Sequence, residues 1–349
     1  MKSLKKLLRI MMPVLAIICT LLFAPWQILW GWIEPLPASI QVEVNKAADD
    51  GLDGIIVYVN RPGKPAEFYS AGWKDKKNHI KADPHALFKI ASISKLYLAV
   101  ATVKLVQAGT LSLNDTLTNL LPELRGRIEN AERITLRMLL QHRSGIPDWI
   151  DDKAFPWGQP PAEVSDVLAL ILDDPAEFKP DTKYSYSNTN YLLIGKILDK
   201  KLGYSHQQFI SRTIATPLGL THTFGSLRDA DSSSVMSGYD THYTGDVKML
   251  DFVSPSGAMV ASAEDVGIFL RALNDGSLLN ADGQKLYSTV YEYEHTGLLP
   301  GYQSIARYHK DIDTIVIQFV NTSGGNNWTK SEVLYKRIVR ILRKNKTDV

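Results

Sequence analysis

The sequence predicts an α+β protein in which an antiparallel sheet of about five strands, built from both ends of the chain, carries terminal helices and a mostly helical insertion. Three observations predict this fold. Strand-like runs rich in β-branched and aromatic residues lie at residues 54–72 and again at 291–320. Between them, from residue 111 to about 275, the apolar residues follow mostly helical spacing. Residues 331–342 have the pattern of a closing amphipathic helix.

Turn-forming residues separate the expected strands. Residues 54–60 form the first strand, Arg61-Pro62-Gly63 the turn, and residues 66–72 an antiparallel partner, which together make a hairpin. A short polar helix is expected ahead of them at residues 42–48. The later strands are expected at residues 291–295, 302–308 and 314–320.

The helical region has recognisable starts and stops. The helix that Ser92 opens should end at Gly109, because glycine is typical of a helix C-terminus. Ser262 to Asp265 has the spacing of a helix start before the apolar run 266–273. Other helices are expected at residues 136–140, 162–172 and 191–195. We expect the folded domain at residues 39–349, with its α/β part at about 39–110 and 280–349 and its helical part at about 111–279.

Length, charge and cysteine content narrow the function classes. The 349 residues are enough for a large core, and the formal net charge is only +2. Because lysine and arginine form no basic block, nucleic acid is not an expected partner. Cys19 is the single cysteine, which excludes a disulfide or a cysteine metal site within the chain. The eight histidines have no ligand-like spacing, so no metal is expected.

Residues 1–38 are expected to lie outside the folded domain as an anchor or signal segment and a linker. Basic residues between Lys2 and Arg9 precede an apolar run from Ile10 to Trp32, which is long enough to span a bilayer at about 1.5 Å per residue. Charges on this side place the rest of the chain outside the cytoplasm. We favour a single-pass membrane anchor, because no clean signal-peptide cleavage site follows. A secreted or periplasmic protein is the alternative if the segment is cleaved.

A candidate nucleophile and its base lie three residues apart in one stretch. Ser92 and Lys95 have the S-x-x-K spacing, which places both side chains on one face of a helix, close enough for the amine to take the hydroxyl proton. Free backbone N–H groups in the first helical turn would stabilise an oxyanion beside Ser92. The motif alone is weak, because most such tetrads are solvated helix surface, so partners downstream must support it.

Two later segments offer these partners. Tyr186 could share proton transfer with Lys95, whose charge would favour the phenolate, and Asn188 could hold Lys95 or orient a substrate amide. A polar turn is the alternative interpretation of this tripeptide. At the end of an expected edge strand, the cation or hydroxyl at His295 and Thr296 could bind a carboxylate, Gly297 would let a ligand approach, and the N–H of Leu298 could complete the oxyanion hole. A strand-end histidine before a turn is the alternative there.

In this order, the three motifs resemble those of the serine β-lactamase and penicillin-binding-protein superfamily, in particular its class C β-lactamase and D-alanyl-D-alanine carboxypeptidase branch. The stretch from Phe88 to Lys95 is similar to the S-x-x-K element, Tyr184 to Asn188 to the Y-x-N loop, and His295-Thr296-Gly297 to the K/H-T-G strand. Residues 134–145, 217–220 and 256–265 match supporting segments in the same order. His142, in the first of these, is expected to be a structural hydrogen bonder.

The resemblance implies a β-lactamase/transpeptidase-like fold and an acyl-enzyme mechanism without metal or organic cofactor. Ser92 would attack a carbonyl, Lys95 and Tyr186 would move protons, and Asn188 would position the reacting groups. The N–H groups of Ser92 and Leu298 would hold the oxyanion. The sequence departs from the pattern at His295, which replaces the lysine of class C β-lactamases, and at Leu298, where many relatives have glycine.

The leading hypothesis is therefore a membrane-anchored serine hydrolase acting outside the cytoplasm on an amide or ester of a small molecule or peptide. A D-amino-acid peptidase or carboxypeptidase, or an esterase, is favoured over a dedicated β-lactamase, because His295 weakens the case for strong carboxylate binding and antibiotic hydrolysis, and Leu298 narrows the cleft beside the nucleophile. The hypothesis from another class is a non-catalytic protein that binds and senses cell-wall fragments. The joint presence of Ser92, Lys95 and Tyr186 speaks for the enzyme, because a binder needs no proton carriers.

Overall fold

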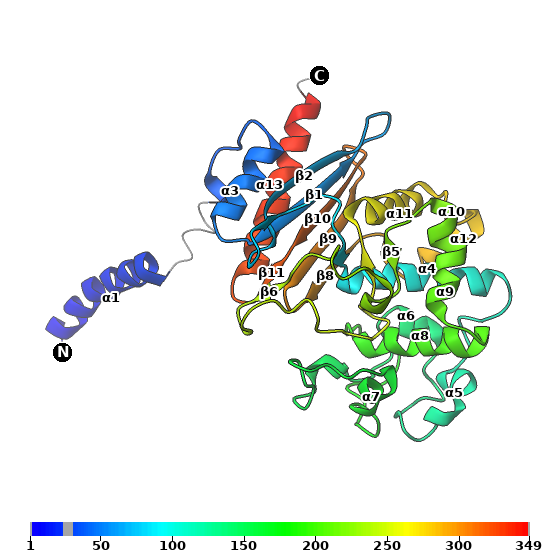
Figure 1. The fold of residues 1–349 in the computed structure, drawn as a ribbon. Coiled ribbons are helices and arrows are strands. Elements are labelled where there is room, and N and C mark those ends of the chain that lie inside the picture. Colours follow the sequence, from blue (N-terminus) through cyan, green and yellow to red (C-terminus); the bar gives the residue numbers. More distant parts are fainter. Residues whose placement is uncertain (1, 24–30, 348–349) are drawn as a thin grey trace.

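The computed structural model describes residues 2–23 and 31–347, and a six-stranded antiparallel sheet lies at its centre, in the order β3-β2-β1-β10-β9-β8 (Figure 1). Its strands are β1 (Gly54–Asn60), β2 (Glu67–Asp75), β3 (Ile80–Lys81), β8 (His295–Leu299), β9 (Tyr302–His309) and β10 (Thr314–Val320). Strand β1 pairs with β10, so that Ile55 lies opposite Val320 and Asn60 opposite Ile315. This pairing joins the two ends of the chain, as predicted.

The predicted strands are confirmed except at one place. Strands β1 and β10 have the expected bounds, whereas the strand expected at residues 291–295 starts at His295 and continues to Leu299. The reason is pairing: His295 lies opposite Ala306 and Leu299 opposite Tyr302, so β8 and β9 form a hairpin with a very short turn. The alternating pattern before His295 belongs to a segment without strand pairing.

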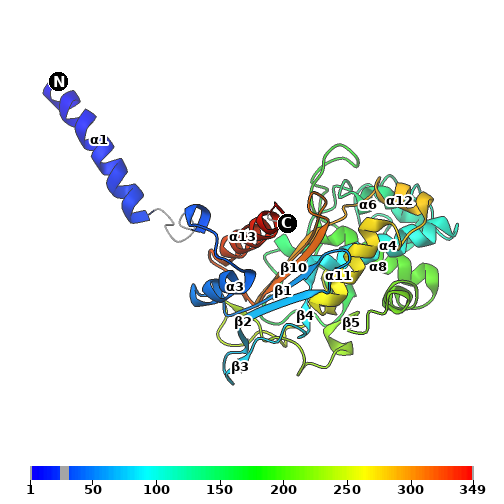
Figure 2. The same cartoon turned by 90° about the horizontal axis from the view of Figure 1, so that it is seen from above.

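Helices cover both faces of the sheet. Helices α3 (Ile40–Asp49) and α13 (Asn327–Thr347) lie on one face, and α11 (Ala263–Asp275) lies on the other (Figure 2). Successive side chains of a strand point to opposite faces. Accordingly, Ile55 and Val57 of β1 belong to the core under α3 and α13, while the alternate residue Ile56 belongs to the core on the α11 side.

The segment between the two halves of the sheet is mostly helical, as predicted. Its helices are α4 (Ser94–Gln107), α5 (Leu117–Leu120), α6 (Leu136–Leu140), α7 (Val164–Ala169), α8 (Asn188–Leu202), α9 (His206–Ile210), α10 (Thr216–Leu218) and, after α11, α12 (Ala281–Tyr287). Short strands β4 (Phe88–Lys89), β5 (Thr223–Phe224) and β7 (Val260–Ala261) form a second sheet, and β6 (Tyr239–Asp240) pairs with β11 (Thr322–Ser323). Ser262 caps α11 by accepting from the N–H of Asp265, which confirms that helix start.

The N-terminal segment is described in part. Residues Lys2–Phe23 form helix α1. The predicted apolar run from Ile10 to Trp32 includes residues 24–30, which lie outside the described residues. None of the helices that the structure describes has both the length and the apolar character that a membrane span requires.

Candidate active site

Ser92 lies on a short turn at the entrance to a buried helix. It is the middle residue of the 3₁₀ turn Ala91–Ile93, which continues directly into α4 at Ser94. The Oγ of Ser94 donates to the carbonyl of Ala91 at 2.6 Å, which braces the turn from inside. Ser92 therefore precedes the α-helix by a few residues instead of opening it, but Lys95 still lies one turn further on, as the spacing predicted.

Lys95 has the surroundings of a general base. Its side chain is 0% exposed, and Nζ lies 2.9 Å from Ser92 Oγ, 2.8 Å from Asn188 Oδ1 and 2.8 Å from the carbonyl oxygen of Ser256. Burial lowers the pKa of Lys95 to about 7, although the charge of Asp148 opposes this. A neutral amine has two N–H groups and one lone pair. With Asn188 and Ser256 accepting both N–H groups, the lone pair is left for the Ser92 hydroxyl.

Asp148, which the sequence analysis missed, orients the Asn188 amide. Its Oδ2 accepts from Nδ2 of Asn188 at 2.8 Å. Because an ionised carboxylate can only accept hydrogen bonds, the amide nitrogen must face Asp148 and the amide oxygen must face Lys95. Asp148 is 7% exposed, and burial raises its pKa, while hydrogen bonds from Asn188 and Ile150 act against the rise. No short motif contains Asp148, since 40 residues separate it from Asn188.

Tyr186 lies next to Ser92, but its side chain is a neutral phenol and not the expected phenolate. Burial raises its pKa while an interaction of its hydroxyl with Ser92 acts to lower it, and its ring centroid is 5.0 Å from the Nζ of Lys95. The prediction that Lys95 favours a phenolate is wrong, because burial raises the pKa of Tyr186 well above its usual range. The lysine lies over the ring face, where it does not pair with the oxygen. A neutral phenol is a proton donor, so Tyr186 is suited to protonating a leaving group.

His142 supports the tyrosine, in agreement with the structural role predicted for it. Its ring stacks on Tyr186 with centroids 4.4 Å apart, and its Nδ1 accepts from the N–H of Ser187 at 3.1 Å. Burial, with the charges of Lys95 and His295 adding to it, lowers the pKa of His142 to about 3. The imidazole is therefore neutral at pH 7 and adds no positive charge beside Lys95.

Strand β8 brings its residues against the nucleophile turn, and it is an edge strand of the sheet, as predicted. A Cβ at Gly297 would lie 2.5 Å from the carbonyl oxygen of Ile90 and 2.9 Å from the Cβ of Ala91. Only glycine allows the strand to approach this closely. Leu298 directs its side chain outward with 56% exposure. The oxyanion role of its N–H, and of the Ser92 N–H, stays a prediction.

His295 is close to Lys95, but it is not the cation that the sequence analysis considered for carboxylate binding. Its Nε2 accepts from the hydroxyl of Tyr291 at 2.8 Å, and its Nδ1 is hydrogen bonded to the carbonyl of Thr296. Burial and the charge of Lys95 lower the pKa of His295 to about 3, against the effect of the Thr296 hydrogen bond. That possibility is therefore wrong: His295 is neutral at pH 7, and both ring nitrogens are occupied.

The remaining evidence for a site is a cleft of about 620 Å³, which is large enough for a small-molecule substrate. Every predicted site residue except Lys95 lines it, and Lys95 lies directly beneath Ser92. The lining predicted residues are Ser92, Tyr186, Asn188, His295, Thr296, Gly297 and Leu298. Residues between the end of β10 and the first turn of α13, together with residues of the helical region, complete the walls of the cleft. Folding thus gathers the distant motifs into one place.

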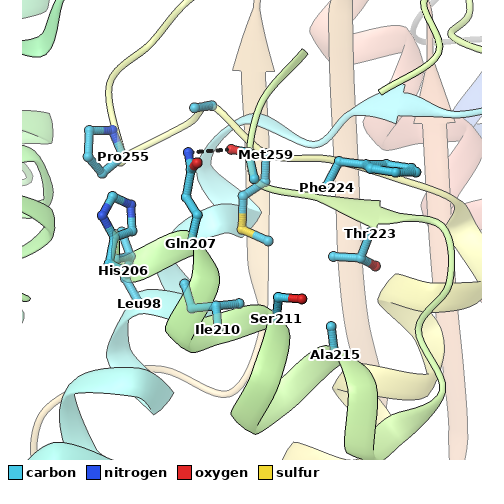
Figure 3. Close-up of a pocket in the computed structure, with 12 residues that line it drawn as sticks. Leu98, His206, Gln207, Ile210, Ser211, Ala215, Thr223, Phe224, Pro255 and Met259 are labelled. Atoms are coloured by element: carbon cyan, nitrogen blue, oxygen red, sulfur yellow. Dashed lines mark hydrogen bonds between the residues drawn. The ribbon is translucent and has the colours of Figure 1, made fainter. Parts of the chain in front are cut away.

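A second cavity, lined by Leu98 of α4 and by residues of α9, is too small to compete with this cleft. Figure 3 shows His206, Gln207 and Ile210 of α9 facing Pro255 and Met259, with the amide of Gln207 donating to the carbonyl of Gly225 at 3.0 Å. Its volume is about 30 Å³, which has room for water but not for an amide or ester substrate. In the described part of the chain, no three or more histidine, cysteine, aspartate or glutamate side chains are grouped so that they could hold a metal ion.

The architecture is that of the β-lactamase/transpeptidase-like fold. The family model described as Beta-lactamase matches residues 40–292, and the chain belongs to this family.

Relatives and solved structures agree with this assignment. Protein flp of Staphylococcus aureus (strain COL) is 29% identical over 251 residues, covering 69% of this chain and 50% of that protein, so the chain spans about half the length of this relative. The putative penicillin-binding protein PbpX of Bacillus subtilis (strain 168) is 26% identical over 299 residues, covering 79% of this chain and 72% of that protein.

Two solved structures have the same fold. D-amino acid amidase from Ochrobactrum anthropi SV3, in complex with L-phenylalanine, superposes with a TM-score of 0.78 at 20% identity, covering 88% of this chain and 99% of that chain. A penicillin-binding protein from Bacillus halodurans superposes with a TM-score of 0.73 at 22% identity, covering 85% and 99%. At these identities, the likeness shows the fold alone.

Proposed function

We propose that this protein hydrolyses an amide or ester through an acyl-enzyme on Ser92, as a D-amino-acid peptidase or amidase, or as an esterase. The observation that carries the proposal is the hydrogen-bonding of Lys95, whose two fixed acceptors leave its lone pair for the Ser92 hydroxyl. The amidase and penicillin-binding neighbours share the fold, and membership of the Beta-lactamase family supports the reaction class.

The reaction follows from these contacts. Lys95 accepts the Ser92 proton as Oγ bonds to the carbonyl carbon, and the N–H groups of Ser92 and Leu298 hold the oxyanion. The bond from carbon to the leaving nitrogen or oxygen then breaks while neutral Tyr186 supplies the proton that the leaving group needs. The proton held by Lys95 returns to the tyrosine oxygen. Water repeats the sequence on the acyl-enzyme, releases the acid and restores Ser92.

Labelling and turnover test the proposal. A fluorophosphonate probe should label the protein at Ser92, and p-nitrophenyl esters should be hydrolysed by the wild type but not by Ser92→Ala. Ser288→Ala is the matched control, because Ser288 is exposed, does not line the cleft, and its Oγ donates to the nearby carbonyl of Lys285 at 2.8 Å. Absence of both labelling and turnover in folded protein would contradict catalysis and favour the cell-wall-fragment sensor.

We also propose that the catalytic domain acts outside the cytoplasm, held by its N-terminal segment. The support is the basic stretch from Lys2 to Arg9 ahead of the apolar run. Protease added to intact cells should digest the domain while cytoplasmic markers survive. A mature N-terminus near Ile40 would contradict anchoring and indicate release of the domain, and protection of the domain from the protease would contradict the external location.

A further inference from the structure

The charges that line the cleft are unusual for a site that would bind an anionic substrate. Among the lining residues that the structure describes, the titratable side chains apart from Ser92 and Tyr186 are Asp240, His242 and His295, and no lysine or arginine is present. Lys95 lies beneath the cleft floor, fully buried and with three partners. It has no N–H to spare for a substrate carboxylate.

The two histidines do not replace this missing cation. His295 already uses both ring nitrogens, one with the hydroxyl of Tyr291 at 2.8 Å and the other with the carbonyl of Thr296. His242 has its Nδ1 2.9 Å from a carboxylate oxygen of Asp240, so this pair carries no net positive charge. A substrate carboxylate in the cleft would lose its water without gaining an ion pair, which is unfavourable.

The rest of the wall is largely apolar. Trp149, Trp157 and Phe252 form an aromatic group on the helical side, with ring centroids 6.4 Å apart for Trp149 and Trp157 and 6.0 Å apart for Trp157 and Phe252. Leu298 and Leu299 line the cleft from strand β8. Such a wall recognises an apolar or aromatic group by excluding water from it.

We propose that the cleft selects acyl donors that carry an apolar or aromatic group and have no free carboxylate beside the scissile bond. The substrate class is then an amide or ester of an apolar acid, and carboxy-terminal peptides and β-lactams, which carry that carboxylate, are poor substrates. This inference rests on the proposed hydrolase function and narrows its substrate. It depends on the occupied nitrogens of His295 and on the aromatic wall.

A pair of thioesters that differ by one charge tests the selectivity. S-phenylacetyl thioglycolate carries a carboxylate on its leaving group, and its methyl ester is neutral. The wild type should hydrolyse the neutral compound with a kcat/KM at least about tenfold higher, and His295→Lys should shift this ratio toward the anion by about tenfold or more. His79→Lys is the matched control, since this exposed histidine lies beside β3 at the opposite edge of the sheet, and it should leave the ratio unchanged.

The acyl group is tested separately. Replacing the phenylacetyl group by acetyl should lower kcat/KM about tenfold in the wild type, and Trp157→Ala should remove most of this difference.

The outcomes separate the two proposals. Turnover of both thioglycolate compounds at equal rates, or preference of the wild type for the anion, overturns the selectivity and leaves the hydrolase function standing. Turnover of neither compound, together with no fluorophosphonate labelling of Ser92, overturns the hydrolase function and this inference with it. The wild-type ratio alone decides the selectivity should His295→Lys fail to fold.

Discussion

Gly297→Ala should disable the site while leaving the fold intact, because the strand that carries Gly297 lies against the nucleophile turn. A Cβ at this position would meet the carbonyl oxygen of Ile90 at 2.5 Å, about 0.9 Å inside an ordinary contact of 3.4 Å, and would lie closer still to Ser304 Oγ. These two neighbours are joined by a hydrogen bond, since Ser304 Oγ donates to the carbonyl of Ile90 at 2.9 Å. The strand must therefore move away from Ser92 by about 0.5–1 Å.

A displacement of this size misplaces the Leu298 N–H relative to the oxyanion. Misplacement of about 1 Å costs about 10²-fold, and loss of one oxyanion donor costs about 10²–10³-fold. We therefore expect kcat for a p-nitrophenyl ester to fall by about 10²–10³-fold in Gly297→Ala. The pre-steady-state acylation rate should fall with it, and circular dichroism should remain that of the wild type.

The matched control is Gly158→Ala, where a Cβ would meet nothing within 4 Å and the backbone needs no positive φ. This variant should keep full activity. An active Gly297→Ala enzyme with wild-type kcat would refute the close approach of β8 as the basis of the oxyanion site. Equal losses in both variants would show that added methyl groups act through the fold instead.

Three further predictions concern the base Lys95, its neighbour Asp148, and the buried ion pair of Arg337 with Glu43. Because the pKa of Lys95 is lowered to about 7 and the base is its neutral form, kcat/KM should rise with pH through about 7 and level off above it, and Lys95→Arg should lose about 10²–10⁴-fold. A flat profile between pH 5 and 9 would count against this base. Asp148→Asn should move that inflection to lower pH, because the charge of Asp148 raises the pKa of Lys95. The same variant should lower kcat about tenfold, because the Asn188 amide loses its fixed orientation. An unmoved inflection would contradict the electrostatic coupling of Asp148 to Lys95. Arg337 and Glu43 form a buried ion pair with contacts of 2.6 and 2.9 Å, so Arg337→Met should lower the free energy of unfolding by about 3–5 kcal/mol in urea titrations. If the double variant Arg337→Met/Glu43→Gln loses much less free energy of unfolding than Arg337→Met alone, the unpaired carboxylate of Glu43 is the cause of the loss.

Much of the fold was predictable from local pattern. The bounds of β1 and β10 could be predicted because their β-branched runs end at turn-forming residues, and α11 could be predicted because Ser262 caps it in the expected way. The start of β8 could not be predicted, because the alternation of aromatic and charged residues before His295 resembles a strand. Only the pairing with β9 shows where the strand begins. Strand β3 was missed because it is two exposed residues long.

The sequence by itself determined which side chains are candidates for the reacting groups. Ser92 and Lys95 are placed by the geometry of a single helical turn, so their contact follows from spacing. The motifs around Tyr186 and His295 were identified by type and order, which is enough to predict a shared site but not the state of each side chain.

Only the tertiary structure decided those states. The neutral phenol of Tyr186, the neutral ring of His295 and the lowered pKa of Lys95 all result from burial, which depends on residues distant in the chain. The role of Asp148 likewise required the fold, because its carboxylate meets Asn188 from 40 residues away. A pattern specifies which groups are present, but solvent exclusion and long-range contacts set their charge, and charge decides what the cleft binds.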